Sequence, residues 1–112
     1  MEITQTQHGN LLIMNLTGRL DAHTSKTFEE RLLQSVEKGH KSILVDFSQL
    51  DYISSAGLRV LLLAARKLSE ANGKIALCNL KPPIKTVFDI AGFSSVFPIF
   101  ATREEALSDF SK

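Results

Sequence analysis

The stretch from Ser42 to Leu62 constrains the fold most, because it joins a strand pattern to a helix pattern across a short turn. Ser42 to Phe47 is a largely apolar run, which is typical of a central strand buried on both faces of a sheet. We expect Ser48 to Asp51 to form a turn. Apolar residues then recur at helical spacing, so we predict a helix from about Ser55 to Asn72, which Gly73 ends.

The rest of the chain alternates strand and helix patterns in the same way. The other predicted strands are Ile3 to Gln7, Leu11 to Leu16 (ended by Gly18), Lys74 to Asn79 and Ser95 to Phe100. The other predicted helices are one with Thr24 or Ser25 as N-cap that Gly39 ends, one entered at Pro82-Pro83 that Gly92 ends, and one from Arg103 to Phe110. This order predicts an α/β fold: a mixed, mostly parallel sheet of about five strands, about four helices and an N-terminal antiparallel hairpin.

Length and charge limit the classes of protein to which the chain can belong. With 112 residues we expect a single domain spanning 1–112. Lys and Arg total 13 against 12 Asp and Glu, so no overall charge indicates nucleic acid or a membrane surface as a partner. No signal-peptide pattern or membrane-length apolar run is present, so we expect a cytoplasmic protein. The one cysteine, Cys78, lies in an apolar run and is predicted to be a core residue.

No set of side chains indicates catalysis. Ser55 lies in Ile-Ser-Ser-Ala-Gly, which lacks the first glycine of the Gly-x-Ser-x-Gly pattern of serine hydrolases. The three histidines, His8, His23 and His40, fall in or near polar loops without a pairing motif. The sequence also lacks metal-ligand spacings of His or Cys and a phosphate-binding loop. We therefore predict that the chain is not an enzyme and uses no metal or other cofactor.

Ser54 and Ser55 lie where the turn meets the predicted helix. The first N–H groups of a helix have no partner within the helix, and together with the helix dipole they favour negative charge. One interpretation is that one of the serines caps the helix and does nothing more. The other is a regulatory phosphorylation site, where a phosphate of about −1.5 to −2 charges suits the helix but not an acidic or apolar partner.

Two apolar residues of this helix, Val60 and Leu63, fall outside its main apolar face. That face, which we expect to pack on the sheet, consists of Leu58, Leu61, Leu62, Ala65 and Leu68. Either Val60 and Leu63 are covered by a neighbouring helix or simply exposed, or they form a patch that docks a partner beside the serines. The pattern leaves both interpretations open.

Four segments resemble the STAS-domain family, in particular its bacterial anti-sigma factor antagonists. They are the signature-like Tyr52 to Leu62, Gly18 to Asp21, Leu44 to Ser48 and Ala91 to Phe93. The resemblance covers essentially the whole chain and implies the STAS fold. It also implies a regulator that binds an anti-sigma factor, itself a serine kinase, and so frees the sigma factor. In such a system the kinase phosphorylates the antagonist, the complex dissociates, and a PP2C-type phosphatase reverses the modification.

When the chain is aligned on Gly57-Leu58, the resemblance assigns the phosphorylated serine to Ser55. Ser54 then occupies a position that is often Asp in the family, and Ala56 one that is often Ser or Thr. The residues expected to support this loop are Asp21, Ser54, Ala56 and Gly57. The expected partner-binding residues are Ser55, Leu58, Arg59, Val60 and Leu63, on a protein expected to be a monomer.

The same resemblance leaves a second function open. Accessory STAS subunits of bacterial lipid-transport ABC systems have a similar hydroxyl–Ala–Gly–Leu turn, which Ser55 to Leu58 matches. Such a subunit is never phosphorylated, and it would co-purify with a membrane permease and an ATPase.

Overall fold

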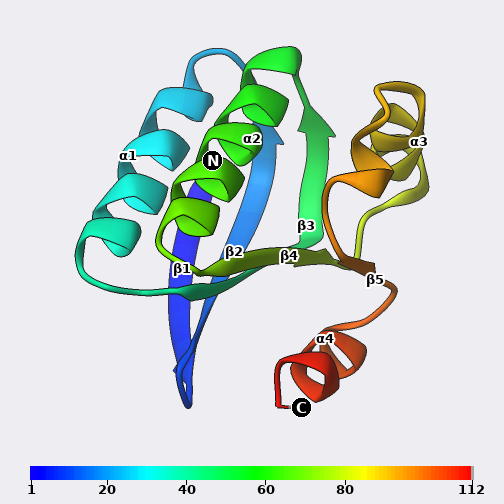
Figure 1. Ribbon diagram of the computed structural model, residues 1–112. Helices are drawn as coiled ribbons and strands as arrows, with labels where there is room; N and C mark the ends of the chain where they lie inside the picture. Colours follow the sequence, from blue (N-terminus) through cyan, green and yellow to red (C-terminus); the bar gives the residue numbers. More distant parts are fainter. Residues whose placement is uncertain (112) are drawn as a thin grey trace.

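The computed structural model describes residues 1–111, in which strands and helices alternate (Figure 1). In order they are β1 (Glu2–His8), β2 (Leu11–Leu20), α1 (Thr24–Glu37), β3 (Ser42–Ile53), α2 (Ser55–Glu70), β4 (Lys74–Cys78), α3 (Pro82–Ile90), the 3₁₀ turn η1 (Phe93–Ser95), β5 (Ile99–Phe100) and α4 (Arg103–Phe110). The predicted order of elements is confirmed, and α4 has the predicted bounds.

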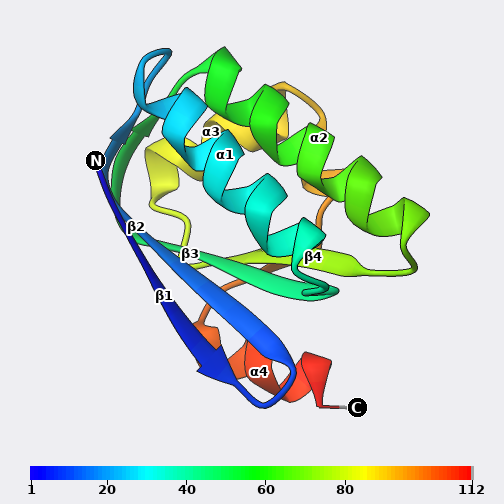
Figure 2. The ribbon, with the colours of Figure 1, turned by 90° about the vertical axis from the view of Figure 1, so that its left-hand side faces the viewer.

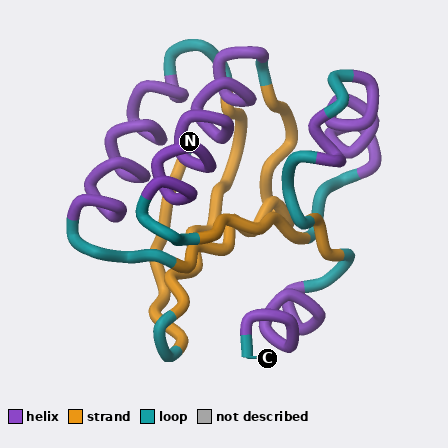
Figure 3. The backbone as a smooth tube through the Cα atoms, viewed as in Figure 1, coloured by secondary structure: helices purple, strands orange, loops and turns teal. Residues whose placement is uncertain are grey.

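The strands, drawn in orange in Figure 3, form one sheet, and their order in it is β1-β2-β3-β4-β5. β1 and β2 are an antiparallel hairpin that pairs Glu2 with Thr17 and His8 with Leu11, and the other neighbours are parallel. Parallel neighbours need crossover connections, which α1, α2 and α3 supply. The predicted α/β fold with a mixed, mostly parallel sheet is therefore confirmed.

The helices cover the two faces of the sheet unequally. Figure 2 shows α1, α2 and α3 on one face and α4 alone on the other. The larger core lies under the first three helices and includes Phe28, Leu61 and Phe88, which are fully buried. On the second face α4 packs Ala106 against the sheet. Because β3 is covered on both sides, every residue from Ile43 to Phe47 is buried, as predicted.

Two strands continue past the points at which the sequence pattern ends them. The predicted turn from Ser48 to Asp51 is wrong, because β3 runs on to Ile53. β2 likewise passes Gly18 and reaches Leu20, so it supplies hydrogen-bonding partners for the extra residues of β3. The register shifts twice along this pairing, and Gly18 has a φ of +105°, which a glycine adopts without strain. The extension carries the chain directly to the start of α2.

Near the C-terminus, the predicted strand from Ser95 to Phe100 is largely wrong. The 3₁₀ turn η1 extends to Ser95, residues 96–98 are not in a strand, and only the short β5 pairs with β4. Aromatic packing explains the turn, because Phe93 and Phe97 both contact Phe88 of α3 edge to face, with ring centroids 6.4 and 6.3 Å away. An extended chain could not bring both rings back onto α3.

Three smaller boundaries also differ from the prediction. α1 has His23 as its N-cap, so the predicted cap at Thr24 or Ser25 is wrong. β4 ends at Cys78 because Asn79 takes a left-handed φ of +58°. α2 ends at Glu70 rather than at Asn72.

Candidate functional site

Ser54 caps the N-terminus of α2. Its backbone is extended, with φ −95° and ψ 171°, and its Oγ accepts a hydrogen bond from the Gly57 N–H at 3.3 Å. Its carbonyl oxygen accepts the first hydrogen bond of the helix, from the Leu58 N–H at 3.0 Å. Both are the contacts of an N-cap residue, so one of the two serines does have the capping role.

Ser55 has a different environment, although it is the next residue. It is the first residue of α2 and is exposed to solvent. Within residues 1–111, no hydrogen bond involves its hydroxyl, whereas the Ser54 hydroxyl accepts the capping bond. The hydroxyl that is free to react with another molecule is therefore that of Ser55, at the positive end of the helix dipole.

Gly57 lets the first turn of α2 lie directly on the ends of β2 and β3. A Cβ atom at this position would lie 2.8 Å from Cγ of Leu20 and 3.0 Å from Cγ1 of Ile53, so any other residue would force these side chains or the helix turn to shift. The Ser54 N–H also donates to the Leu20 carbonyl oxygen at 2.9 Å. Close packing and this hydrogen bond together fix the position of the serine turn on the sheet.

Asp21 follows Leu20 and so lies beside the serine turn, but its carboxylate contacts α1. Its Oδ1 accepts hydrogen bonds from the Thr24 N–H at 2.9 Å and from the Thr24 hydroxyl at 3.0 Å. The backbone and side-chain hydrogen bonds from Thr24 lower the pKa of Asp21 below its ordinary value. Asp21 therefore holds the loop between β2 and α1 in place, and this loop forms part of the surroundings of Ser55.

A shallow groove of about 320 Å³ separates the first turns of α1 and α2, which run side by side (Figure 1). Its lining residues are Ala22, Ser25, Lys26, Glu29, Ala56, Arg59, Val60 and Leu63. The more buried lining residues, Ser25, Val60 and Leu63, make a mostly apolar floor, and the exposed Lys26 and Arg59 make a charged rim. This groove begins next to Ser55, because Ala56 is the next residue along the helix.

The expected partner-binding residues differ in how far a partner could reach them. Leu58 and Val60 are only 8% and 6% exposed and belong to the main core. Val60 is thus covered because α1 packs beside α2, which agrees with the interpretation that a neighbouring helix covers it. Leu63 is half-buried in the groove, and Arg59 is exposed at its rim. Ser55, Arg59 and Leu63 therefore offer most of the accessible surface.

Comparison with known proteins identifies the family. The model of the STAS domain matches residues 2–106, which is nearly the whole chain. The chain belongs to the STAS domain family. The resemblance seen in its sequence is thereby confirmed.

Several proteins similar to this STAS domain are named as anti-sigma factor antagonists. One of them is BtrV of Bordetella bronchiseptica. It is 41% identical to this chain over 110 residues, which are 98% of this chain and 95% of BtrV. A Thermotoga maritima structure described in the same terms has a TM-score of 0.94 at 18% identity, covering 98% of this chain and 95% of that one. The antagonist SpoIIAA in its unphosphorylated form has a TM-score of 0.86 at 23% identity, covering 98% and 96%. Phosphorylated Bacillus SpoIIAA also matches, with a TM-score of 0.77.

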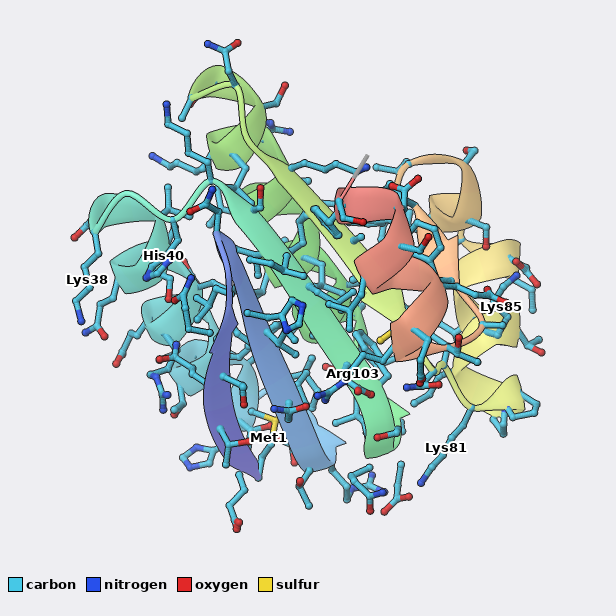
Figure 4. The ribbon with its side chains drawn as sticks, turned by 90° about the horizontal axis from the view of Figure 1, so that it is seen from below. Met1, Lys38, His40, Lys81, Lys85 and Arg103 are labelled. Carbon is cyan, nitrogen blue, oxygen red and sulfur yellow. The ribbon has the colours of Figure 1, made fainter. Side chains whose placement is uncertain are left out.

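The sequence analysis did not predict a polar cluster around the buried Asp46 on the second face of this STAS domain. Asp46 of β3 is only 3% exposed, and its Oδ2 accepts hydrogen bonds from Arg103 Nη2 at 2.8 Å and Nε at 3.0 Å. Its Oδ1 accepts from the Ser48 N–H at 2.9 Å and from Asn79 Nδ2 at 3.2 Å. Arg103 also donates to Asn15 Oδ1, and Figure 4 shows it lying over the sheet. The cluster joins β2, β3 and α4.

The contacts of this cluster hold parts of the fold together. Burial by itself would raise the pKa of Asp46, but hydrogen bonds from Ser48, Arg103 and Asn79 outweigh it and hold that pKa below its ordinary value. Cys78, fully buried as predicted, has its pKa raised to about 12 by burial and by the Asp46 carboxylate. A thiol in this state is unreactive.

Two negative findings hold for the part of the chain that the structure describes. Residues 1–111 contain no group of His, Cys, Asp and Glu side chains that could hold a metal ion. No helix among them is both long and apolar enough to cross a membrane.

Proposed function

We propose that this STAS domain is an anti-sigma factor antagonist whose binding is switched by phosphorylation of Ser55. The unphosphorylated protein, a cytoplasmic monomer, binds an anti-sigma factor that is also a serine kinase and thereby frees the sigma factor. The names of BtrV and SpoIIAA support the class of function, and SpoIIAA has been solved both with and without phosphate. The protein acts by binding the anti-sigma factor and does not itself catalyse a reaction.

The observation that carries the proposal is the difference between the two serines. The Ser54 hydroxyl is engaged in the cap, while that of Ser55 is exposed on the first turn of α2. A phosphate on Ser55 would meet free helix N–H groups and the positive end of the dipole, so the fold would tolerate it.

The proposed modification is an ordinary phosphoryl transfer from ATP. The Ser55 oxygen forms a bond to the γ-phosphorus, the bond from that phosphorus to the β–γ bridging oxygen breaks, and ADP leaves. The hydroxyl proton passes to a base of the kinase. The PP2C-type phosphatase reverses the step by hydrolysis, which returns the hydroxyl and releases inorganic phosphate.

The groove beside Ser55 supplies the surface for the partner. Its apolar floor includes Leu63, and its rim includes Arg59. A partner that covers the floor lies close to Ser55, because the next residue, Ala56, lines the groove. Adding about two negative charges there imposes a desolvation cost on the complex but not on the free protein. Binding is therefore lost while the domain stays folded.

The test is to measure binding to the kinase encoded beside the gene, or to the kinase that co-purifies with the protein, for three variants. Ser55→Ala should bind as well as the wild type and resist labelling by ATP. Ser55→Asp should bind more weakly. Ser69→Asp is the matched control, since Ser69 is also an exposed serine of α2 but lies near its other end, and it should bind normally.

Labelling of another residue by the kinase would refute the assignment to Ser55. Equal binding by Ser55→Asp and the wild type would refute the switch. Co-purification with a membrane permease and an ATPase, without phosphate on Ser55, would instead support the accessory-subunit function.

A further inference from the structure

The groove beside Ser55 has one charge that is not balanced within it. Lys26 and Glu29 of α1 carry opposite charges three residues apart, so their fields largely cancel at the groove. Arg59 of α2 has no acidic residue three or four positions away in its own helix, and the groove as a whole has two positive side chains against one negative. None of the ion pairs within residues 1–111 involves Lys26, Glu29 or Arg59.

The position of Arg59 relative to Ser55 is favourable for an ion pair. The two residues are four apart in α2, so they lie on the same side of the helix one turn apart. Long side chains in helices point back towards the N-terminus, which directs Arg59 over the turn that holds Ser55. A negative group that precedes a positive one by four residues has the favourable orientation with respect to the helix dipole.

Another nearby arginine is already engaged. The guanidinium of Arg19 lies 4.3 Å from the centre of the Tyr52 ring, as a cation–π pair at the ends of β2 and β3. Within residues 1–111 the Arg59 guanidinium makes no hydrogen bond, ion pair or ring contact, so all of its N–H donors are available to a phosphate.

We infer that Arg59 is the intramolecular partner of the phosphate on Ser55: once Ser55 is phosphorylated, the Arg59 guanidinium pairs with the phosphate and no longer offers its charge to a binding partner. A guanidinium fits phosphate oxygens with two parallel N–H donors, which gives this pair its geometry. The inference rests on the proposed function and deepens it. Phosphorylation then weakens the complex in two ways, by adding negative charge and by removing a positive one from the rim of the groove.

The test uses full-length protein with phosphoserine inserted at residue 55 during translation, so it requires no kinase. Phosphorus NMR across a pH titration gives the pKa of the phosphate in the otherwise wild-type protein, in Arg59→Gln and in Arg66→Gln. Arg66 is the matched control, because it is also an exposed arginine of α2 but lies further from Ser55 along the helix. We expect the phosphate pKa to be higher in Arg59→Gln than in the other two proteins, since the helix N-terminus acts equally in all three.

A second measurement needs no substitution of arginine. In the phosphorylated protein, the Nε–H resonance of Arg59 should shift as the phosphate titrates, while that of Arg66 should not. Equal phosphate pKa values in all three proteins, with no titration of the Arg59 resonance, would overturn the inference. A different result would refute the proposed function, namely equal binding of the kinase by Ser55→Asp and the wild type. The two failures can therefore be told apart.

Discussion

Replacing Gly57 by Ala tests whether close packing fixes the serine turn. The new Cβ atom would lie 2.8 Å from Cγ and 2.9 Å from Cδ2 of Leu20, and 3.0 Å from Cγ1 of Ile53. Leu20 is fully buried and Ile53 is only 4% exposed, so neither side chain can swing out into solvent. The first turn of α2 must therefore move away from the sheet, or the core must be strained.

Two effects of opposite sign set the size of the change. An extra methyl group in a packed core costs about 1–3 kcal/mol. Replacing Gly by Ala in the interior of a helix stabilises it by up to about 1 kcal/mol, and a position in the first turn, such as that of Gly57, gains only part of this. We therefore expect Gly57→Ala to lower the free energy of unfolding by about 1–2 kcal/mol.

Urea unfolding of a double-mutant cycle with Leu20→Ala isolates the clash. Leu20→Ala removes the Cγ and Cδ2 atoms that the new methyl group meets, so Gly57→Ala should cost less in that background. A stability of Gly57→Ala equal to that of the wild type, or a cost that Leu20→Ala leaves unchanged, would refute the packing argument.

Three further predictions concern the cap and the buried cluster. Ser54→Ala should lower the free energy of unfolding by about 1 kcal/mol in urea titrations, because it removes the acceptor of the Gly57 N–H; an unchanged stability would exclude capping by this hydroxyl. Arg103→Met should cost roughly 3 kcal/mol near neutral pH, because it leaves the Asp46 carboxylate buried without its cation. Since the folded-state pKa of Asp46 is lowered, its stabilisation is present above the unfolded-state pKa and is lost as the pH falls through the folded value. The difference between Arg103→Met and the wild type should therefore shrink in unfolding curves at acidic pH, and a difference that grows would contradict this reasoning. Finally, Cys78 should react with a thiol reagent only as fast as the protein opens, because the side chain is fully buried and its pKa is raised to about 12; a rate in native protein equal to that in urea would show otherwise.

The elements that sequence predicts best are those whose information is local. The terminal helix is an example, since Thr102 and Glu105 lie within one turn of each other, and the Thr102 Oγ1 does accept a hydrogen bond from the Glu105 N–H at 3.2 Å. The second half of β3 was missed for the opposite reason. Ser48 and Gln49 are polar and exposed, and only pairing with the distant β2 makes them part of a strand.

The candidate site, too, has features that the sequence predicts and features that depend on contacts between distant residues. The sequence and its family resemblance indicate the serine turn, but only the structure assigns the cap to Ser54, because both hydroxyls are at capping distance along the chain. The ion pair between the buried Asp46 and the half-buried Arg103 joins residues far apart in the sequence and has no local pattern. Its one sequence clue is a charged residue inside the apolar run of β3, since a buried charge needs a partner.

The use of Ser54 as an uncharged cap has an electrostatic consequence for Ser55. The resemblance implies that Asp often stands at this position, and an Asp cap would place a negative charge next to the serine that we propose is phosphorylated. Like charges so close together repel and raise the energy of the phosphorylated form. With Ser54 the N-terminus of α2 is capped by a neutral hydroxyl, and the nearby Asp21 carboxylate is directed to Thr24 of α1. The positive end of the helix dipole and the Arg59 guanidinium are thus left to act on whatever charge Ser55 acquires.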